Sequence, residues 1–150
     1  MRLLLSALLA VGMASVASAQ TVPDQPVMLV PLVDGGKAIA PAASVAQIVG
    51  LKKGGDGYVS VRGAPSPKGN ERDRLTLGHY VLAANPLDDW KKATFIGVIY
   101  ADRKEGPEGG LEAACGIENP PPPTVTAKKV YTGPCKSGWV HKRFVKVLAD

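Results

Sequence analysis

Apolar and polar residues alternate most regularly at Tyr58–Arg62, where two valines are flanked by Tyr, Ser and Arg. A period of two is typical of a β-strand with one buried face. Other strand-like segments are short, rich in β-branched residues and separated by Gly, Pro, Asn and Asp turns. The expected strands are residues 45–51, 58–62, 80–84, 90–100, 124–130 and 137–148. After residue 20, helical spacing is confined to one turn at 111–115, so the pattern predicts an all-β fold.

Three segments lack a periodic apolar face. Residues 63–74 combine Gly, Pro, Ser and Asn with charged side chains, which predicts a long surface loop. Residues 20–43 are rich in Pro, Ala and Gly and are interpreted as a leader or linker, because Pro31 argues against a central strand. Residues 101–134 form an insert with four consecutive prolines at 120–123. That run favours a stiff polyproline II spacer, and a ligand for an aromatic groove is the alternative.

The first nineteen residues have the organisation of a cleavable secretory signal peptide. Met1 and Arg2 form a short positive region, and an apolar run follows over residues 3–16. The next residues, Ala17-Ser18-Ala19, have the small-x-small pattern that signal peptidase cleaves. The apolar run is shorter than the roughly 20 residues that span a bilayer. We therefore expect cleavage after Ala19 and a periplasmic or secreted protein without a membrane anchor.

Cleavage would leave 131 of the 150 residues, a length typical of one domain. It would also lower the formal net charge from +5 to +4, because Arg2 is lost. Such a mild positive excess does not point to a nucleic-acid partner.

The two cysteines, Cys115 and Cys135, are expected to form a disulfide in an oxidising compartment. The alternative is a metal site that adds His79 and His141. Zinc sites place their thiolates in close pairs, whereas these two cysteines are isolated. We therefore expect no metal and no cofactor.

Three further segments occur in a characteristic order. Residues 57–66 form a strand that ends in a Val-Arg pair and a small-residue-Pro-Ser turn, and residues 75–84 lead into a tryptophan-bearing segment at 89–92. Residues 137–145 contain a Gly-Trp-Val strand, then Arg-Phe-Val. In this order they resemble the bacterial SH3-like (SH3b) domains of exported and cell-wall proteins. The resemblance implies a small SH3-like barrel of about five to six strands over residues 44–150, interrupted by the proline-rich insert 101–134. It also implies a short helical turn after the Gly-Trp-Val strand.

The resemblance further implies a binding or targeting module. The expected partner is a cell-wall peptide, a peptidoglycan component or another envelope protein, and the expected state is a monomer. The expected ligand-binding residues are Tyr58, Arg62, Arg72, Arg74, Trp90 and Trp139. The alternative for these residues is plain core packing of the tryptophans and a solvated charged loop.

Catalysis is not expected, because no nucleophile elbow or zinc-protease motif accompanies His79 or His141. A second hypothesis is a structural or partner-binding periplasmic protein that acts through its proline-rich insert.

Overall fold

The computed structural model describes residues 20–84, 90–106, 108–117 and 123–149, and it confirms a mostly β fold. The strands are β1 (Met28–Leu29), β2 (Pro31–Asp34), β3 (Lys37–Pro41), β4 (Ser44–Ile48), β5 (Tyr58–Arg62), β6 (Glu71–Thr76), β7 (Tyr80–Ala83), β8 (Phe95–Tyr100), β9 (Lys129–Val130), β10 (Lys136–His141) and β11 (Val145–Ala149). A short helix, α2 (Leu111–Ala114), lies in the insert. A 3₁₀ turn, η1 (Lys142–Phe144), joins β10 to β11.

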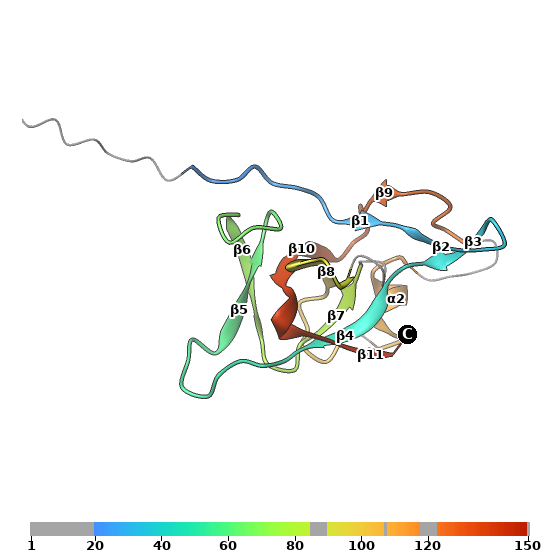
Figure 1. The fold of residues 1–150 in the computed structure, drawn as a ribbon. Helices are drawn as coiled ribbons and strands as arrows, with labels where there is room; N and C mark the ends of the chain where they lie inside the picture. Colours follow the sequence, from blue (N-terminus) through green and yellow to red (C-terminus); the bar gives the residue numbers. More distant parts are fainter. Residues whose placement is uncertain (1–19, 85–89, 107, 118–122, 150) are drawn as a thin grey trace, which may run out of the picture.

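Seven strands form one antiparallel sheet in the order β11-β4-β7-β8-β10-β5-β6 (Figure 1). Within the described part of the chain its edges, β11 and β6, do not pair, so the expected closed barrel is not found. The sheet nevertheless curls, so that the turn between β6 and β7 forms hydrogen bonds with the end of β4. There Gly78 donates its N–H to the carbonyl of Ile48 (2.8 Å), and Ile48 donates to the carbonyl of His79 (2.9 Å).

The first hydrophobic core lies on the concave side of this sheet and receives side chains from all seven strands. In β5, Val59 and Val61 point into it, as the alternation predicts. Burial of each such side chain contributes about 1.5–3 kcal/mol relative to exposure. The buried members are Ala46, Ile48, Val59, Val61, Leu75, Val81, Ala83, Ile96, Val98, Tyr100, Val140 and Val145.

A second core lies on the opposite face of β7 and β8, between the sheet, the insert and the leader. Leu82 and Ile99 of the sheet contact it, and α2 adds Leu111. The predicted disulfide between Cys115 and Cys135 is confirmed, with the two Cα atoms 5.0 Å apart. The other buried members of this second core are Val27, Leu29, Ala84, Ile117, Val125 and Tyr131.

Several predicted element bounds need correction. Residues 71–74 belong to strand β6 rather than to a long loop. Strand β6 is an edge strand, and an edge strand can keep charged side chains in contact with solvent. The strand predicted at 90–100 begins only at Phe95, and Trp90 has helical backbone geometry. Of residues 124–130, only Lys129–Val130 forms a strand. The predicted strand 137–148 is divided into β10 and β11 by η1.

The leader carries β1, β2 and β3, and it buries Val27 and Leu29 against the domain. The Asp34-Gly35-Gly36 turn joins β2 to β3, a two-stranded hairpin outside the main sheet. The predicted signal peptide and prolines 120–122 lie outside the described residues. Among the residues that are described, no helix has the length and apolar character needed to cross a bilayer.

Candidate functional site

A groove lies on the outer face of the sheet, where β5 meets β10 and η1. Tyr58, Ser60 and Arg62 alternate with the core valines of β5 and therefore project to this face. Two adjoining pockets of about 420 and 260 Å³ form the groove. Both are lined by Asp56, Tyr58, Arg143 and Phe144, so they form one continuous depression.

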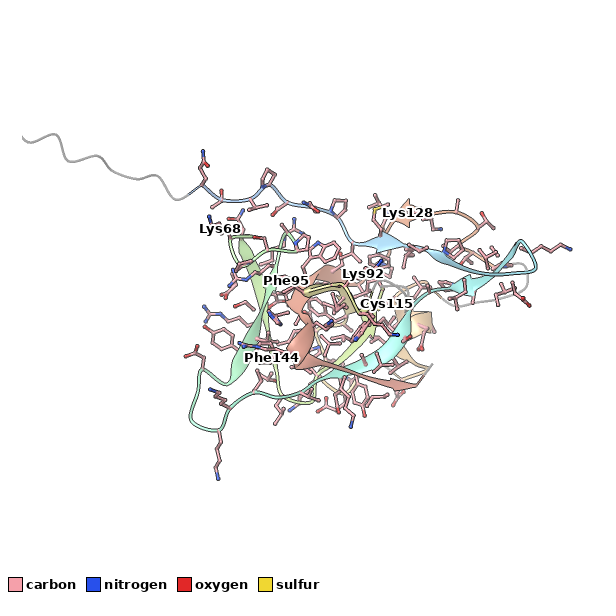
Figure 2. All side chains as sticks on the ribbon, viewed as in Figure 1. Lys68, Lys92, Phe95, Cys115, Lys128 and Phe144 are labelled. Carbon is pink, nitrogen blue, oxygen red and sulfur yellow. A yellow bond between two sulfur atoms is a disulfide. The ribbon has the colours of Figure 1, made fainter. Side chains whose placement is uncertain are left out.

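The floor of the groove is aromatic. Phe95 and His141 are paired residues of β8 and β10, and their ring centroids lie 5.4 Å apart. The His141 ring also lies 6.2 Å from the Phe144 ring, again edge to face. Figure 2 shows Phe95 and Phe144 in the region where β5 approaches β10 and η1. We call this set, together with Tyr58, Arg62 and Arg143, the aromatic groove.

The fold of η1 positions this floor. The Nδ1 atom of His141 accepts a hydrogen bond from the N–H of Arg143 (3.3 Å), which caps the 3₁₀ turn. The guanidinium of Arg143 then lies 4.5 Å from the centroid of the Phe144 ring. Within the described residues Arg143 makes no ion pair, so its charge is available to an anionic ligand.

A second arginine covers the other wall. The guanidinium of Arg74 stacks 4.2 Å above the Tyr58 ring and pairs with Glu71 at 2.6 Å. The hydrogen bond from Ser60, followed by the one from Arg74, lowers the pKa of Glu71. The same contact with Glu71 raises the pKa of Arg74. Both side chains are therefore charged at neutral pH, and Arg74 is already engaged by a carboxylate.

The structure brings together three of the six predicted binding residues. Tyr58 and Arg62 line the aromatic groove, and Arg74 stacks on Tyr58. Arg62 also donates to the carbonyl of Gly69 (2.9 Å), which fixes its head group at the rim.

The other three predicted residues lie elsewhere. Arg72 pairs with Asp24 at 2.6 Å. Trp139 projects to the same face as Arg62 but packs against the second core. Trp90 packs against the first core, and its carbonyl accepts a hydrogen bond from Lys142 (2.8 Å).

The expected ligand-binding residues did not include four groove residues, Phe95, His141, Arg143 and Phe144, although Phe144 was expected to be a bulky core or groove residue. The last three follow Trp139 in the closing segment, so their position in or next to the strand that contains Trp139 could be inferred from the sequence. The position of Phe95 beside His141 could not, because it depends on the register of β8 against β10.

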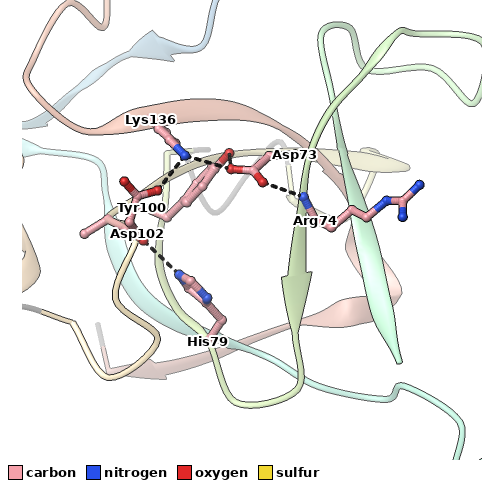
Figure 3. Close-up of polar contacts among 7 residues, drawn as sticks. Asp73, Arg74, His79, Tyr100, Asp102 and Lys136 are labelled. Atoms are coloured by element: carbon pink, nitrogen blue, oxygen red, sulfur yellow. Dashed lines mark hydrogen bonds and ion pairs between the residues drawn. The ribbon is translucent and has the colours of Figure 1, made fainter. Parts of the chain in front are cut away.

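A polar cluster on the other side of the sheet ties β6, β8 and β10 together (Figure 3). Lys136 bridges Asp73 (3.3 Å) and Asp102 (2.5 Å), and the Tyr100 hydroxyl donates to Asp73 (3.1 Å). Burial raises the pKa of Tyr100, and its Asp73 partner adds to the shift. The carboxylates of Asp102 and Asp73 raise the pKa of Lys136. At neutral pH Tyr100 is therefore protonated and Lys136 is charged, so neither provides a base.

The same cluster includes His79, which is buried and shares a hydrogen bond with the carbonyl of Ala101 (2.9 Å). The metal alternative that joined the two histidines to the two cysteines is wrong, because both sulfur atoms are in the disulfide. Across the described residues, no group of three or more His, Cys, Asp or Glu side chains is arranged to hold a metal ion.

Comparison with known proteins finds no family model, no curated protein and no solved structure that matches the chain.

Proposed function

We propose that the protein is an exported, non-catalytic SH3-like binding module that recognises a cell-envelope peptide or a peptidoglycan component. The aromatic groove is the observation that carries this proposal. It combines apolar rings with the guanidinium of Arg143, which has no ion-pair partner among the described residues, and this suits a ligand that has both apolar groups and carboxylates. Peptidoglycan stem peptides have this chemistry, and the predicted signal peptide would deliver the protein to their compartment.

Three features support the SH3-like assignment. Strand β10 contains the Gly-Trp-Val sequence, and the short helical turn that the resemblance implies follows it as η1. An apolar pair in β11, Val145 and Val147, then packs against the first core. The curled sheet around one core is also compatible with a barrel-like arrangement.

The polar groups support a binding role over a catalytic one. The groove residues with hydrogen-bonding capacity are arginines, a tyrosine and a histidine whose Nδ1 caps η1. The polar cluster around Tyr100 lies on the other side of the sheet, and within it Tyr100 and Lys136 are held in their protonated forms.

The test uses the full chain, expressed with its signal sequence and purified from the exported fraction. Mass spectrometry first checks the amino terminus, which we expect at Gln20. Retention on insoluble peptidoglycan is then measured across a salt series for the wild type, Arg143→Gln and Arg103→Gln. Arg103 is an exposed arginine of the insert and gives the same change of charge outside the groove.

We expect the wild type to be retained even at high salt. R143Q should lose retention by about tenfold or more, in line with the loss of a charge-assisted contact. R103Q should be retained like the wild type. Equal losses for both variants and disappearance in modest salt would show that only the net charge acts. No retention by any form would reject the wall ligand and direct attention to protein partners of the insert 101–134.

A further inference from the structure

The segment that follows the predicted cleavage site is an extended strap that contacts β6, the β5–β6 loop and β10. We define the strap as residues 20–26, which run past the β5–β6 loop towards β1 (Figure 1). Lys68 marks the tip of that loop next to the strap (Figure 2). Val22 donates its N–H to the carbonyl of Lys68 (3.4 Å), and Gln25 donates to the carbonyl of Gly63 (2.8 Å). The strap is therefore bound partly through its backbone.

Two side chains of the domain also bind the strap. Trp139 donates its indole N–H to the carbonyl of Gln25 (2.8 Å). Arg72 pairs with the carboxylate of Asp24 at 2.6 Å. Apart from the half-buried Val22, the strap residues are exposed, and core anchoring begins only at Val27. These contacts are of the kind that hold a bound peptide rather than a buried strand.

The surface beneath the strap is shaped for the close approach of a backbone. Gly63 and Gly69 are buried, and a Cβ atom on Gly63 would overlap the Asp24 carboxylate. Gly69 is also the bridge partner of Val22. Because Arg62 binds the carbonyl of Gly69 and lines the aromatic groove, this surface continues the groove.

We propose that the strap is a tethered ligand, and that the surface beneath it is a binding site for extended peptides in which prolines flank an acidic residue. The proposal rests on the binding function given above and names the peptide chemistry at one end of the groove. Pro23 and Pro26 directly follow the two residues whose N–H groups are used, so they stiffen the segment without removing either bond. Asp24 supplies the contact that selects an acidic residue, through Arg72.

The strap is suited to exchange. Its ion pair is exposed, with 46% and 44% of the two side chains accessible, so it holds the strap only weakly. A short tether gives an effective concentration on the order of millimolar. A free peptide with a dissociation constant of about 0.1 mM would then bind the wild type roughly tenfold more weakly than a variant with a released strap.

The experiment measures the fluorescence anisotropy of a labelled peptide, Thr-Val-Pro-Asp-Gln-Pro, against the full exported chain. Asp24→Lys places a cation opposite Arg72 and releases the strap. The matched control is Asp34→Lys, the same charge change in the β2–β3 hairpin. We expect D24K to bind the peptide about tenfold more tightly than the wild type and D34K to match the wild type. The double variant D24K/R72E should bind the acidic peptide weakly, because R72E removes the cation that contacts the acidic residue of the strap and of the peptide.

Thermal melts establish that each variant is folded, and Asp24→Asn replaces D24K if that variant is not. Equal peptide binding by the wild type, the strap variant and D34K overturns the proposal, as does an absence of binding to a folded strap variant. If the strap variant dimerises and does not bind the peptide, the proposal is overturned, and the surface instead binds the strap of a second copy. Peptidoglycan retention that depends on Arg143 is a separate readout, so it can stand when the tethered ligand fails, and peptide binding can stand without it.

Discussion

The indole N–H of Trp139 lies 2.8 Å from the carbonyl of Gln25, a residue 114 positions earlier in the chain. This hydrogen bond connects the closing strand of the sheet to the segment that follows the predicted signal peptide. It explains why Trp139, expected in a ligand groove, is partly covered in this structure. Trp139 therefore reports whether the strap is bound to the domain.

Trp139→Phe should remove this hydrogen bond while keeping most of the ring packing against the second core. We expect a loss of about 0.5–1.5 kcal/mol in the free energy of unfolding, the usual net value of one hydrogen bond. Urea denaturation measures it. Limited proteolysis should also cut the variant faster near Gln25, and unchanged cleavage there would contradict the role given to the indole.

The disulfide between Cys115 and Cys135 closes the insert over the second core. Its removal in Cys115→Ser/Cys135→Ser should lower the free energy of unfolding by about 3 kcal/mol on the loop-entropy model. The Tyr131 hydroxyl donates to the carbonyl of Cys115 (2.8 Å) and accepts from the N–H of Cys135 (3.1 Å), so both hydrogen bonds should also loosen. Chemical denaturation with and without reductant checks this. Reductant should destabilise the wild type and leave the double variant unchanged, and equal stability of all forms would refute the prediction.

Strand β5 could be predicted from the sequence with its bounds, because one face is buried and the alternation is complete. Strand β8 could not, since all six of its residues are buried and a strand covered on both faces has no period to mark its start. Strand β6 resembled a loop because Glu71, Arg72, Asp73 and Arg74 are charged. An edge strand tolerates such residues, and they also discourage pairing with other chains.

The candidate site was likewise predictable from the sequence only in part. Tyr58 and Arg62 were predictable because they lie on the polar face of an alternating strand. Phe95 reaches the groove only through the pairing of β8 with β10, and single-sequence patterns do not specify which residues pair. The strap was equally hidden, because its contacts join Asp24 to Arg72 and Gln25 to Trp139 across long stretches of sequence.

Acid should weaken the edge strand β6 through Glu71. The hydrogen bond from Ser60 and then that from Arg74 lower the pKa of Glu71 from 4.5, so its stabilising contribution is complete above pH 4.5 and is lost as the pH falls through the lower folded-state value. Glu71→Gln should therefore have a flatter stability profile below pH 4.5 than the wild type. Thermal melts between pH 2 and pH 7 measure this. Ser60→Ala, which removes the largest cause of the shift, should give an intermediate profile, and superimposable curves for the three proteins would contradict the prediction.

At Gly138, strand β10 approaches β5 closely. A Cβ atom there would overlap the side chain of Val61 and lie 2.9 Å from the backbone oxygen of Arg62, so any larger residue pushes β10 away from β5. Gly138→Ala should cost about 1–3 kcal/mol in the free energy of unfolding, the usual range for overpacking a core. Because Arg62 also lines the aromatic groove, the variant should lose ligand retention on peptidoglycan even at temperatures where it remains folded. Gly55→Ala is the control: it also lines the groove, but its new Cβ would meet only the exposed turn at Lys52. If both variants unfold at the same denaturant concentration, the close approach of β5 and β10 does not set the stability of this part of the sheet.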